Sequence, residues 1–89
     1  MIEASTLNAD EYYILDVRTQ HEWDTRHIPG AHHLELNQAL KNLDTIPLDK
    51  PVAVICHSGN RASIVASSLM NKKVGDIFNV RGGMQAWKQ

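Results

Sequence analysis

The single cysteine of the chain, Cys56, stands directly after a short apolar run. The loop that it opens reads Cys-His-Ser-Gly-Asn-Arg, and a segment with an apolar stripe follows it. A short loop between a buried strand and a helix N-terminus turns several backbone N–H groups toward one point, which makes an anion site. A cysteine sulfur there is favoured as the thiolate, the nucleophilic form. We therefore expect Cys56 to be the nucleophile, and its substrate to be bound by His57, Ser58, Gly59, Asn60 and Arg61.

For several candidate residues the sequence leaves two alternative roles open. Arg61 either contacts the substrate or organises the loop by binding backbone carbonyls. His57 either steers an anion when it is protonated or is a solvent-exposed loop residue. Arg81, beyond another apolar run, either attracts anions or is a solvated charge. For Cys56 itself, the alternative is a buried side chain that only packs.

Polar and aromatic residues earlier in the chain are interpreted as structural. Arg18 and Glu22 are suitably placed to pair at the start of a helix, and Asp16 can accept N–H bonds from the following loop. Trp23 and Trp87 are expected to belong to the core.

Short apolar runs predict the strands that must carry these residues. Residues 13–17 and 52–56 are continuous apolar runs rich in β-branched side chains, which is typical of buried parallel strands. Residues 77–80 form a weaker run, and residues 32–36 alternate between polar and apolar side chains. A short edge strand is expected near residues 2–4.

Capping residues predict helices between the strands. Asn8 followed by Glu11 indicates a short capped helix, and Thr19 followed by Glu22 is a capping box directly after a strand. Asn37 can cap one or two further turns, in which one face is shared by Leu36, Leu40 and Leu43. The strongest helix follows the loop, where the spacing i, i+3, i+4, i+7, i+8 is occupied by Ala62, Val65, Ala66, Leu69 and Met70.

The order of these elements predicts the fold class. A last short helix is expected from about Met84, with Trp87 buried. Strands that alternate with helices form right-handed βαβ units and an α/β fold, in which a mostly parallel sheet of about five strands has helices on both faces. Ligands of such sheets bind beyond the carboxyl ends of the strands, which is where Cys56 is placed.

The sequence resembles the rhodanese-like domain family from about Ile14 to Trp87. Four motifs carry the resemblance: Leu15-Asp16-Val17-Arg18 with Glu22-Trp23, His27-Ile28-Pro29-Gly30-Ala31, the loop 56–62, and Gly82-Gly83 with Trp87. The resemblance implies a five-stranded parallel sheet flanked by helices and a catalytic cysteine, here Cys56, that alternates between thiolate and persulfide. One departure is Arg26, at a position where the family usually has glycine.

The length of the loop separates two activities within this resemblance. Sulfurtransferases of the family have a six-residue loop, which matches Cys56 to Arg61 here, whereas the related phosphatases have one residue more. We therefore expect a thiosulfate sulfurtransferase, in which the backbone N–H groups of residues 57–61 stabilise the sulfur anion. The alternatives are a persulfide relay module between protein partners and, less favoured by the loop, a phosphatase or arsenate reductase.

Composition limits the partners of the chain. Its 89 residues form one expected domain, 1–89, with nine basic and ten acidic residues and no block of like charge. We expect a cytoplasmic monomer with no nucleic-acid or membrane partner, acting on a small anionic sulfur donor and a thiophilic acceptor, with a protein donor or acceptor as a further possibility. The adjacent His32 and His33 would point to opposite faces of a strand, so we expect no metal and no organic cofactor.

Overall fold

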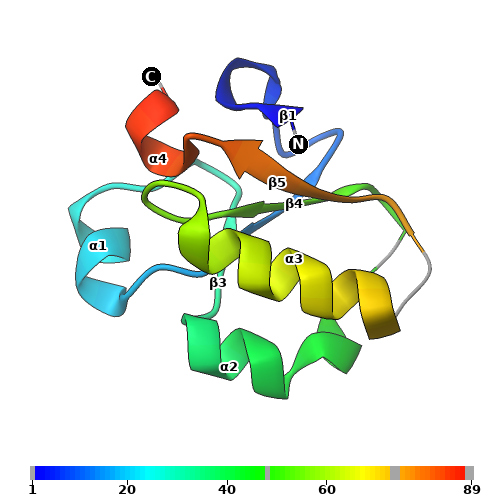
Figure 1. The fold of residues 1–89 in the computed structure, drawn as a ribbon. Coiled ribbons are helices and arrows are strands. Elements are labelled where there is room, and N and C mark those ends of the chain that lie inside the picture. Colours follow the sequence, from blue (N-terminus) through cyan, green and yellow to red (C-terminus); the bar gives the residue numbers. More distant parts are fainter. Residues whose placement is uncertain (1, 48, 73–74, 88–89) are drawn as a thin grey trace.

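Five short parallel strands form one sheet in the computed structural model, which describes residues 2–47, 49–72 and 75–87 (Figure 1). Every strand pair in this sheet is parallel. The spatial order is β1-β5-β4-β2-β3, formed by β1 (Ile2–Glu3), β2 (Tyr13–Asp16), β3 (His32–His33), β4 (Val52–Ile55) and β5 (Ile77–Arg81). The predicted α/β fold with a five-stranded parallel sheet is confirmed.

Helices cover both faces of the sheet, as predicted. The helices are α1 (Gln20–Thr25), α2 (Leu36–Lys41), α3 (Asn60–Lys72) and α4 (Gly83–Ala86), with short 3-10 turns η1 (Ala4–Thr6) and η2 (Leu43–Thr45). In Figure 1, α2 and α3 lie together on one side of the sheet, and α4 and η1 lie on the other.

Side chains of the strands alternate between two apolar clusters. On the face toward α2 and α3, one cluster includes Leu15, Val54 and Cys56 together with the helix residues Val65 and Leu69. On the opposite face, a second cluster joins strand residues to the two ends of the chain and is formed by Ala4, Ile14, Ile28, Ala53, Ile55, Val80, Met84 and Trp87. The central strand β4 is buried on both faces, as its continuous apolar run predicts.

Local signals in the sequence set the ends of several elements. The capping box at the start of α1 is present, with Thr19 accepting from the backbone N–H of Glu22 and Glu22 accepting from that of Thr19. The apolar stripe of α3 is buried at Ala62, Val65, Ala66 and Leu69, but the predicted fifth member, Met70, is 55% exposed. Met70 lies two residues before the end of α3, beside the fully buried Leu69.

Three predicted elements are shorter or begin elsewhere. The predicted helix at Asn8 is only a turn: Asn8 accepts from the Glu11 N–H at 2.9 Å, but the chain enters β2 two residues later. The strand predicted over residues 32–36 ends after His33, because α2 begins at Leu36. The N-cap of α2 is Glu35 rather than Asn37, and the Glu35 backbone N–H donates to the Gln38 side chain at 3.1 Å.

Candidate active site

Cys56 lies at the carboxyl end of β4, and its sulfur is the point on which two backbone donors converge. The Sγ atom accepts hydrogen bonds from the N–H groups of Gly59 at 3.0 Å and Ala62 at 3.3 Å. Cys56 is only 1% exposed. The cradle expected from residues 57–61 therefore includes Gly59, and it also extends one residue beyond Arg61 into α3. Such donors stabilise negative charge on sulfur.

The shape of the loop depends on glycine at position 59. Gly59 has φ +109°, a backbone conformation that residues with a side chain rarely adopt. Its carbonyl accepts the N–H of Ser63 at 3.1 Å, which begins the hydrogen bonding of α3. The loop can therefore close within six residues and turn the Gly59 N–H toward the sulfur.

The first residues of α4 hold the outer side of the same loop. The Met84 N–H donates to the Cys56 carbonyl at 2.7 Å, and the Gln85 N–H donates to the His57 carbonyl at 3.1 Å. Glycine at position 83 is required here, because a Cβ would collide with the Cys56 carbonyl oxygen and lie 2.7 Å from that of His57. These two bonds direct the Cys56 and His57 carbonyls at α4, away from the sulfur that the Gly59 and Ala62 N–H groups bind.

Arg61 closes the loop through an ion pair with Glu22 of α1. The guanidinium donates from Nη1 to Glu22 Oε1 at 2.7 Å and from Nη2 to Oε2 at 3.0 Å. This bidentate bond lowers the pKa of Glu22 from 4.5 to about 2 and, seen from the other partner, raises the pKa of Arg61. The sequence left two roles open for Arg61, contact with the substrate or bonds to backbone carbonyls, and the structure shows its guanidinium bound to a carboxylate of this chain instead.

The predicted pair of Arg18 with Glu22 is wrong. Arg18 instead binds Asp16, with Nη2 at 2.8 Å from Oδ2, and both residues are buried. The Arg18 backbone N–H also donates to Asp16 Oδ1 at 3.0 Å, as expected for Asp16. Arg18 precedes the N-cap of α1, outside the helix, and its side chain binds Asp16 of β2, so Glu22 is available to bind Arg61.

Arg26, where the family usually has glycine, joins α1 to α4. Its Nη2 donates to the carbonyls of Met84 and Trp87, both at 3.1 Å. The guanidinium also lies 5.0 Å from the centre of the Trp87 ring, which is buried as predicted. Arg26 therefore fixes the carboxyl end of the short helix whose amino end holds the active loop.

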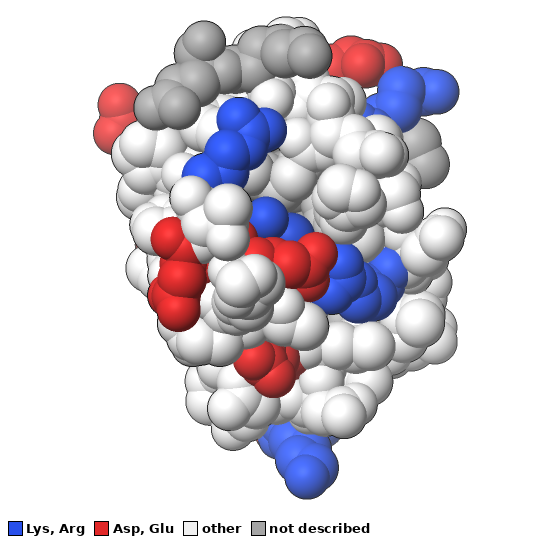
Figure 2. Space-filling model, turned by 90° about the vertical axis from the view of Figure 1, so that its left-hand side faces the viewer, with Lys and Arg blue, Asp and Glu red and all other residues white. Residues whose placement is uncertain are grey.

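A hollow of about 400 Å³ opens beside the loop, on the face turned to the viewer in Figure 2. Lys and Arg side chains alternate with acidic ones across the middle of this face. Its lining comes from α1, the loop and α4, and consists of Arg18, His21, Glu22, Thr25, Arg26, His57, Met84 and Gln85. Two of the charged residues in its lining are already paired, Glu22 with Arg61 and Arg18 with Asp16.

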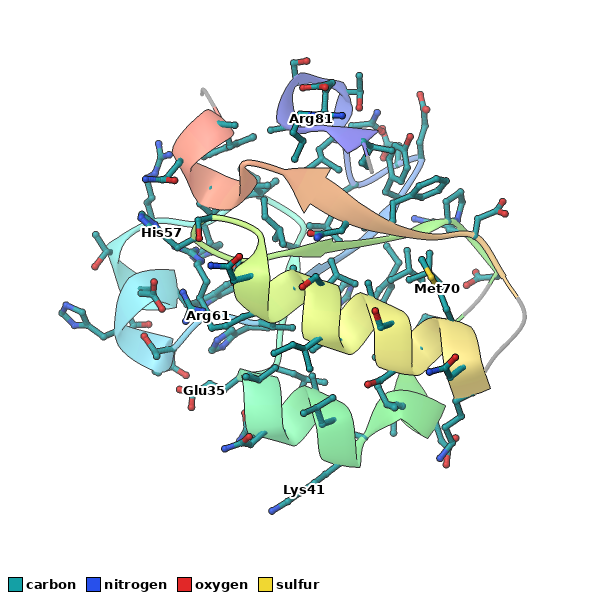
Figure 3. All side chains as sticks on the ribbon, in the orientation of Figure 1. Glu35, Lys41, His57, Arg61, Met70 and Arg81 are labelled. Carbon is teal, nitrogen blue, oxygen red and sulfur yellow. The ribbon has the colours of Figure 1, made fainter. Side chains whose placement is uncertain are left out.

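The remaining candidate residues divide between the loop and more distant positions. His57, Ser58 and Asn60 are exposed at the loop, and Figure 3 shows His57 and Arg61 at the same end of the sheet. Arg81 is the last residue of β5 and pairs with Glu3 of β1 at 2.9 Å, and Figure 3 shows it apart from His57 and Arg61.

The predicted core position of Trp23 is wrong. Trp23 is only half-buried, and its ring stacks on His27 and His33 with centroid distances of 3.7 and 4.8 Å. His32 stacks instead on Tyr13, so the two adjacent histidines have different surroundings. Among the described residues there is no cluster of three side chains that could hold a metal ion.

Sequence analysis did not identify the roles of four residues that support the loop: Glu22, Arg26, Ala62 and Asn79. The Asn79 side chain of β5 donates to the Gly59 carbonyl. Ala62 could have been found from the geometry of a helix N-terminus, whose first N–H groups are unpaired. The other three act across large sequence separations, 39 residues for Glu22 and 20 for Asn79, and no spacing rule predicts such contacts.

Comparison with known protein families matches residues 3–89 to the rhodanese-like domain. The chain belongs to the rhodanese-like domain family. This is a family of sulfurtransferases, which supports a role in sulfur transfer in general. The earlier resemblance is thereby confirmed over nearly the whole chain.

Individual relatives of this rhodanese-like chain agree with sulfur transfer. The thiosulfate sulfurtransferase GlpE of Pseudomonas syringae pv. syringae is 29% identical over 97% of this chain and 81% of its own length. A putative sulfur carrier protein of Bacillus subtilis, YrkF, is 34% identical over 83% of this chain but only 40% of its own length. The crystal structure of a rhodanese-related protein from Thermoplasma volcanium superposes with a TM-score of 0.88 and 31% identity, over 97% of this chain and 87% of that one.

In the described part of the chain, no helix has the length and apolarity that a membrane crossing requires.

Proposed function

We propose that this rhodanese-like domain is a thiosulfate sulfurtransferase with Cys56 as its nucleophile. The thiolate attacks the outer sulfur of thiosulfate, the sulfur–sulfur bond breaks, and sulfite leaves with the bonding electron pair. A thiophilic acceptor such as cyanide then attacks the terminal sulfur of the Cys56 persulfide, and Cys56 leaves again as the thiolate. The observation that carries this proposal is the convergence of the Gly59 and Ala62 N–H groups on Cys56 Sγ.

The residues around Cys56 have different roles in the proposal. Gly59 and Ala62 stabilise the anionic sulfur in both steps, as oxyanion-hole donors do. His57, Ser58 and Asn60 are exposed at the loop and contact the donor as it enters. Arg61 contributes positive charge beside the sulfur while Glu22 fixes its position. The proposed site holds no metal or organic cofactor, and the proposed form is a cytoplasmic monomer in which residues 1–89 act as one domain.

A persulfide relay between proteins is the second candidate. It is favoured by the likeness to the putative sulfur carrier YrkF. A relay would load from a protein persulfide in a single turnover and would turn over thiosulfate and cyanide poorly.

A phosphatase or arsenate reductase is disfavoured by the short loop. Phosphoryl transfer requires several donors placed around the equatorial oxygens. In this loop two backbone N–H groups already point at the sulfur itself, at 3.0 and 3.3 Å. Assay of the wild type with an aryl phosphate tests this exclusion, and Cys56-dependent cleavage at the rate of sulfur transfer would contradict it.

The experiment is a comparison of the wild type with Cys56→Ser. Serine is close in size and its hydroxyl is not ionised at neutral pH, so we expect a folded protein without thiosulfate:cyanide sulfurtransferase activity. Substantial residual turnover in the variant would mean that another group carries the sulfur. A parallel single-turnover assay with a protein persulfide donor separates the enzyme from the relay, because only the enzyme also sustains steady-state turnover of thiosulfate.

A further inference from the structure

Asn79, in the middle of β5, reaches the active loop from a neighbouring strand. Its Nδ2 donates to the Gly59 carbonyl at 3.2 Å, across 20 residues of sequence. Strand alternation places Asn79 on the same face of the sheet as Ile77, which packs in the cluster that contains Cys56 and the inner side of α3. Asn79 is thus a polar side chain beside the start of α3, directed at the loop.

The residue that Asn79 holds is Gly59, whose carbonyl also accepts the Ser63 N–H at 3.1 Å. Gly59 has no side chain and has φ +109°, so its own backbone preferences do not select one conformation. Its N–H is one of the two donors to Cys56 Sγ. A bond to its carbonyl restricts rotation on the other side of the same Cα atom, and this keeps the N–H directed at the sulfur.

The amide oxygen of Asn79 differs from its nitrogen in hydrogen bonding. Its Oδ1 is buried and has no hydrogen-bond partner among the described residues. A buried acceptor without a donor lowers stability, so an apolar side chain at this strand position would suit folding better. The unpaired oxygen of Asn79 therefore lowers the stability of the fold. The hydrogen bond that its side chain does make is the one to the Gly59 carbonyl.

We propose that Asn79 is a positioning residue, whose amide holds Gly59 so that the Gly59 N–H stabilises charge on Cys56 Sγ. The inference rests on the proposed role of Cys56 as a sulfur nucleophile. A purely structural role, tying β5 to α3, makes a different prediction. Loss of a structural tie lowers stability and leaves the reactivity of the thiol unchanged, whereas loss of a positioning bond changes the thiol and spares the fold.

The test uses Asn79→Leu, which keeps the branching of the side chain and removes both the donor and the unpaired acceptor. Asn79→Ala is the second variant, in case leucine does not fit. Asn71→Leu is the matched control, because Asn71 is exposed near the end of α3, away from the loop. For each protein we would measure the urea midpoint of unfolding and the iodoacetamide alkylation rate of Cys56 at about pH 6 relative to about pH 9, which reports the thiolate fraction.

In at least one Asn79 variant that folds, we expect the alkylation ratio to fall about five- to tenfold, which corresponds to weakening one charge-assisted hydrogen bond. We expect the urea midpoint of that variant to equal or exceed the wild-type value, and Asn71→Leu to leave the ratio unchanged. An unchanged ratio in the Asn79 variants that fold would overturn the proposal, whatever their urea midpoints. Sulfur loading of the wild type is scored separately: its failure would remove the proposed function, while the alkylation ratios would still decide the role of Asn79.

Discussion

Two arginine–carboxylate pairs lie at the carboxyl edge of the sheet, and they differ in burial and in the sequence separation of their partners. In the Asp16–Arg18 pair the side chains are 1% and 5% exposed, and the partners are two residues apart. In the Glu22–Arg61 pair they are 29% and 31% exposed, and the partners are 39 residues apart. Both pairs are held by short bidentate contacts, so geometry alone does not distinguish them.

The two pairs serve different purposes: the buried pair stabilises the fold, and the half-exposed pair positions a residue of the active loop. Arg18 also donates to the Arg26 carbonyl at 2.7 Å, so the buried pair fixes the path of the chain from β2 to the end of α1. The half-exposed pair joins α1 to the last residue of the active loop, and its Glu22 side chain also lines the hollow of about 400 Å³ beside that loop. We infer that breaking the first pair affects mainly folding and breaking the second affects mainly the chemistry at Cys56.

The largest effect is expected from breaking the buried pair. Asp16→Ala leaves the Arg18 guanidinium buried without its carboxylate, and loss of one partner of a buried pair costs about 3–5 kcal/mol. For a domain of this size that is a large part of the free energy of unfolding. Urea unfolding measures the loss. Arg81→Ala is the control, because its pair with Glu3 is more than 60% exposed and is worth less than about 1 kcal/mol. Equal midpoints for the two variants would contradict the distinction.

A smaller effect on folding and a clear effect on activity are expected from Glu22→Gln. Glutamine keeps the shape of the side chain but not the charge that fixes Arg61, so sulfurtransferase activity should fall about tenfold, a change of about 1.4 kcal/mol in the barrier. The free energy of unfolding should change by no more than about 1 kcal/mol. Glu11→Gln, an exposed carboxylate remote from the loop, should leave both quantities unchanged. If Glu22→Gln lowers the free energy of unfolding by about 3–5 kcal/mol while the folded variant keeps full specific activity, the roles of the two pairs are reversed.

The smallest effect is a pH dependence specific to the half-exposed pair. Arg61 holds the pKa of Glu22 at about 2 in the folded chain, below its ordinary 4.5. A carboxylate with a lowered pKa adds stability above its ordinary pKa and loses it as the pH falls toward the folded value. The stability difference between wild type and Glu22→Gln should therefore shrink as the pH is lowered from 4.5 toward about 2. A difference that stays constant over this range would show that charge does not hold the pair together.

The sequence allowed the parts of the fold that depend on local patterns to be predicted. The Thr19–Glu22 capping box, the stripe of α3 and the buried strands β2 and β4 follow from spacing within a few residues. The position of Cys56 beyond β4 followed from the same patterns. Because parallel strands end at one edge, that position was enough to predict the neighbourhood of the site.

Contacts between distant segments could not be read in this way. Arg18 and Glu22 have helical spacing, but Arg18 precedes the helix, so each finds another partner. The start of α2 was misplaced because Glu35, whose carboxylate also accepts the Gln20 N–H at 2.7 Å, stops β3 early. The bonds from α4 to the Cys56 and His57 carbonyls depend on how two loops meet, which only the folded chain defines.

The central claim, that Cys56 carries sulfur, is tested most directly by intact mass spectrometry of the wild type and Cys56→Ser before and after incubation with thiosulfate. We predict that the wild type gains the mass of one sulfur atom, that cyanide or a reductant removes it, and that Cys56→Ser gains nothing. A wild-type mass that does not change under these conditions, or an equal gain in Cys56→Ser, would contradict the account.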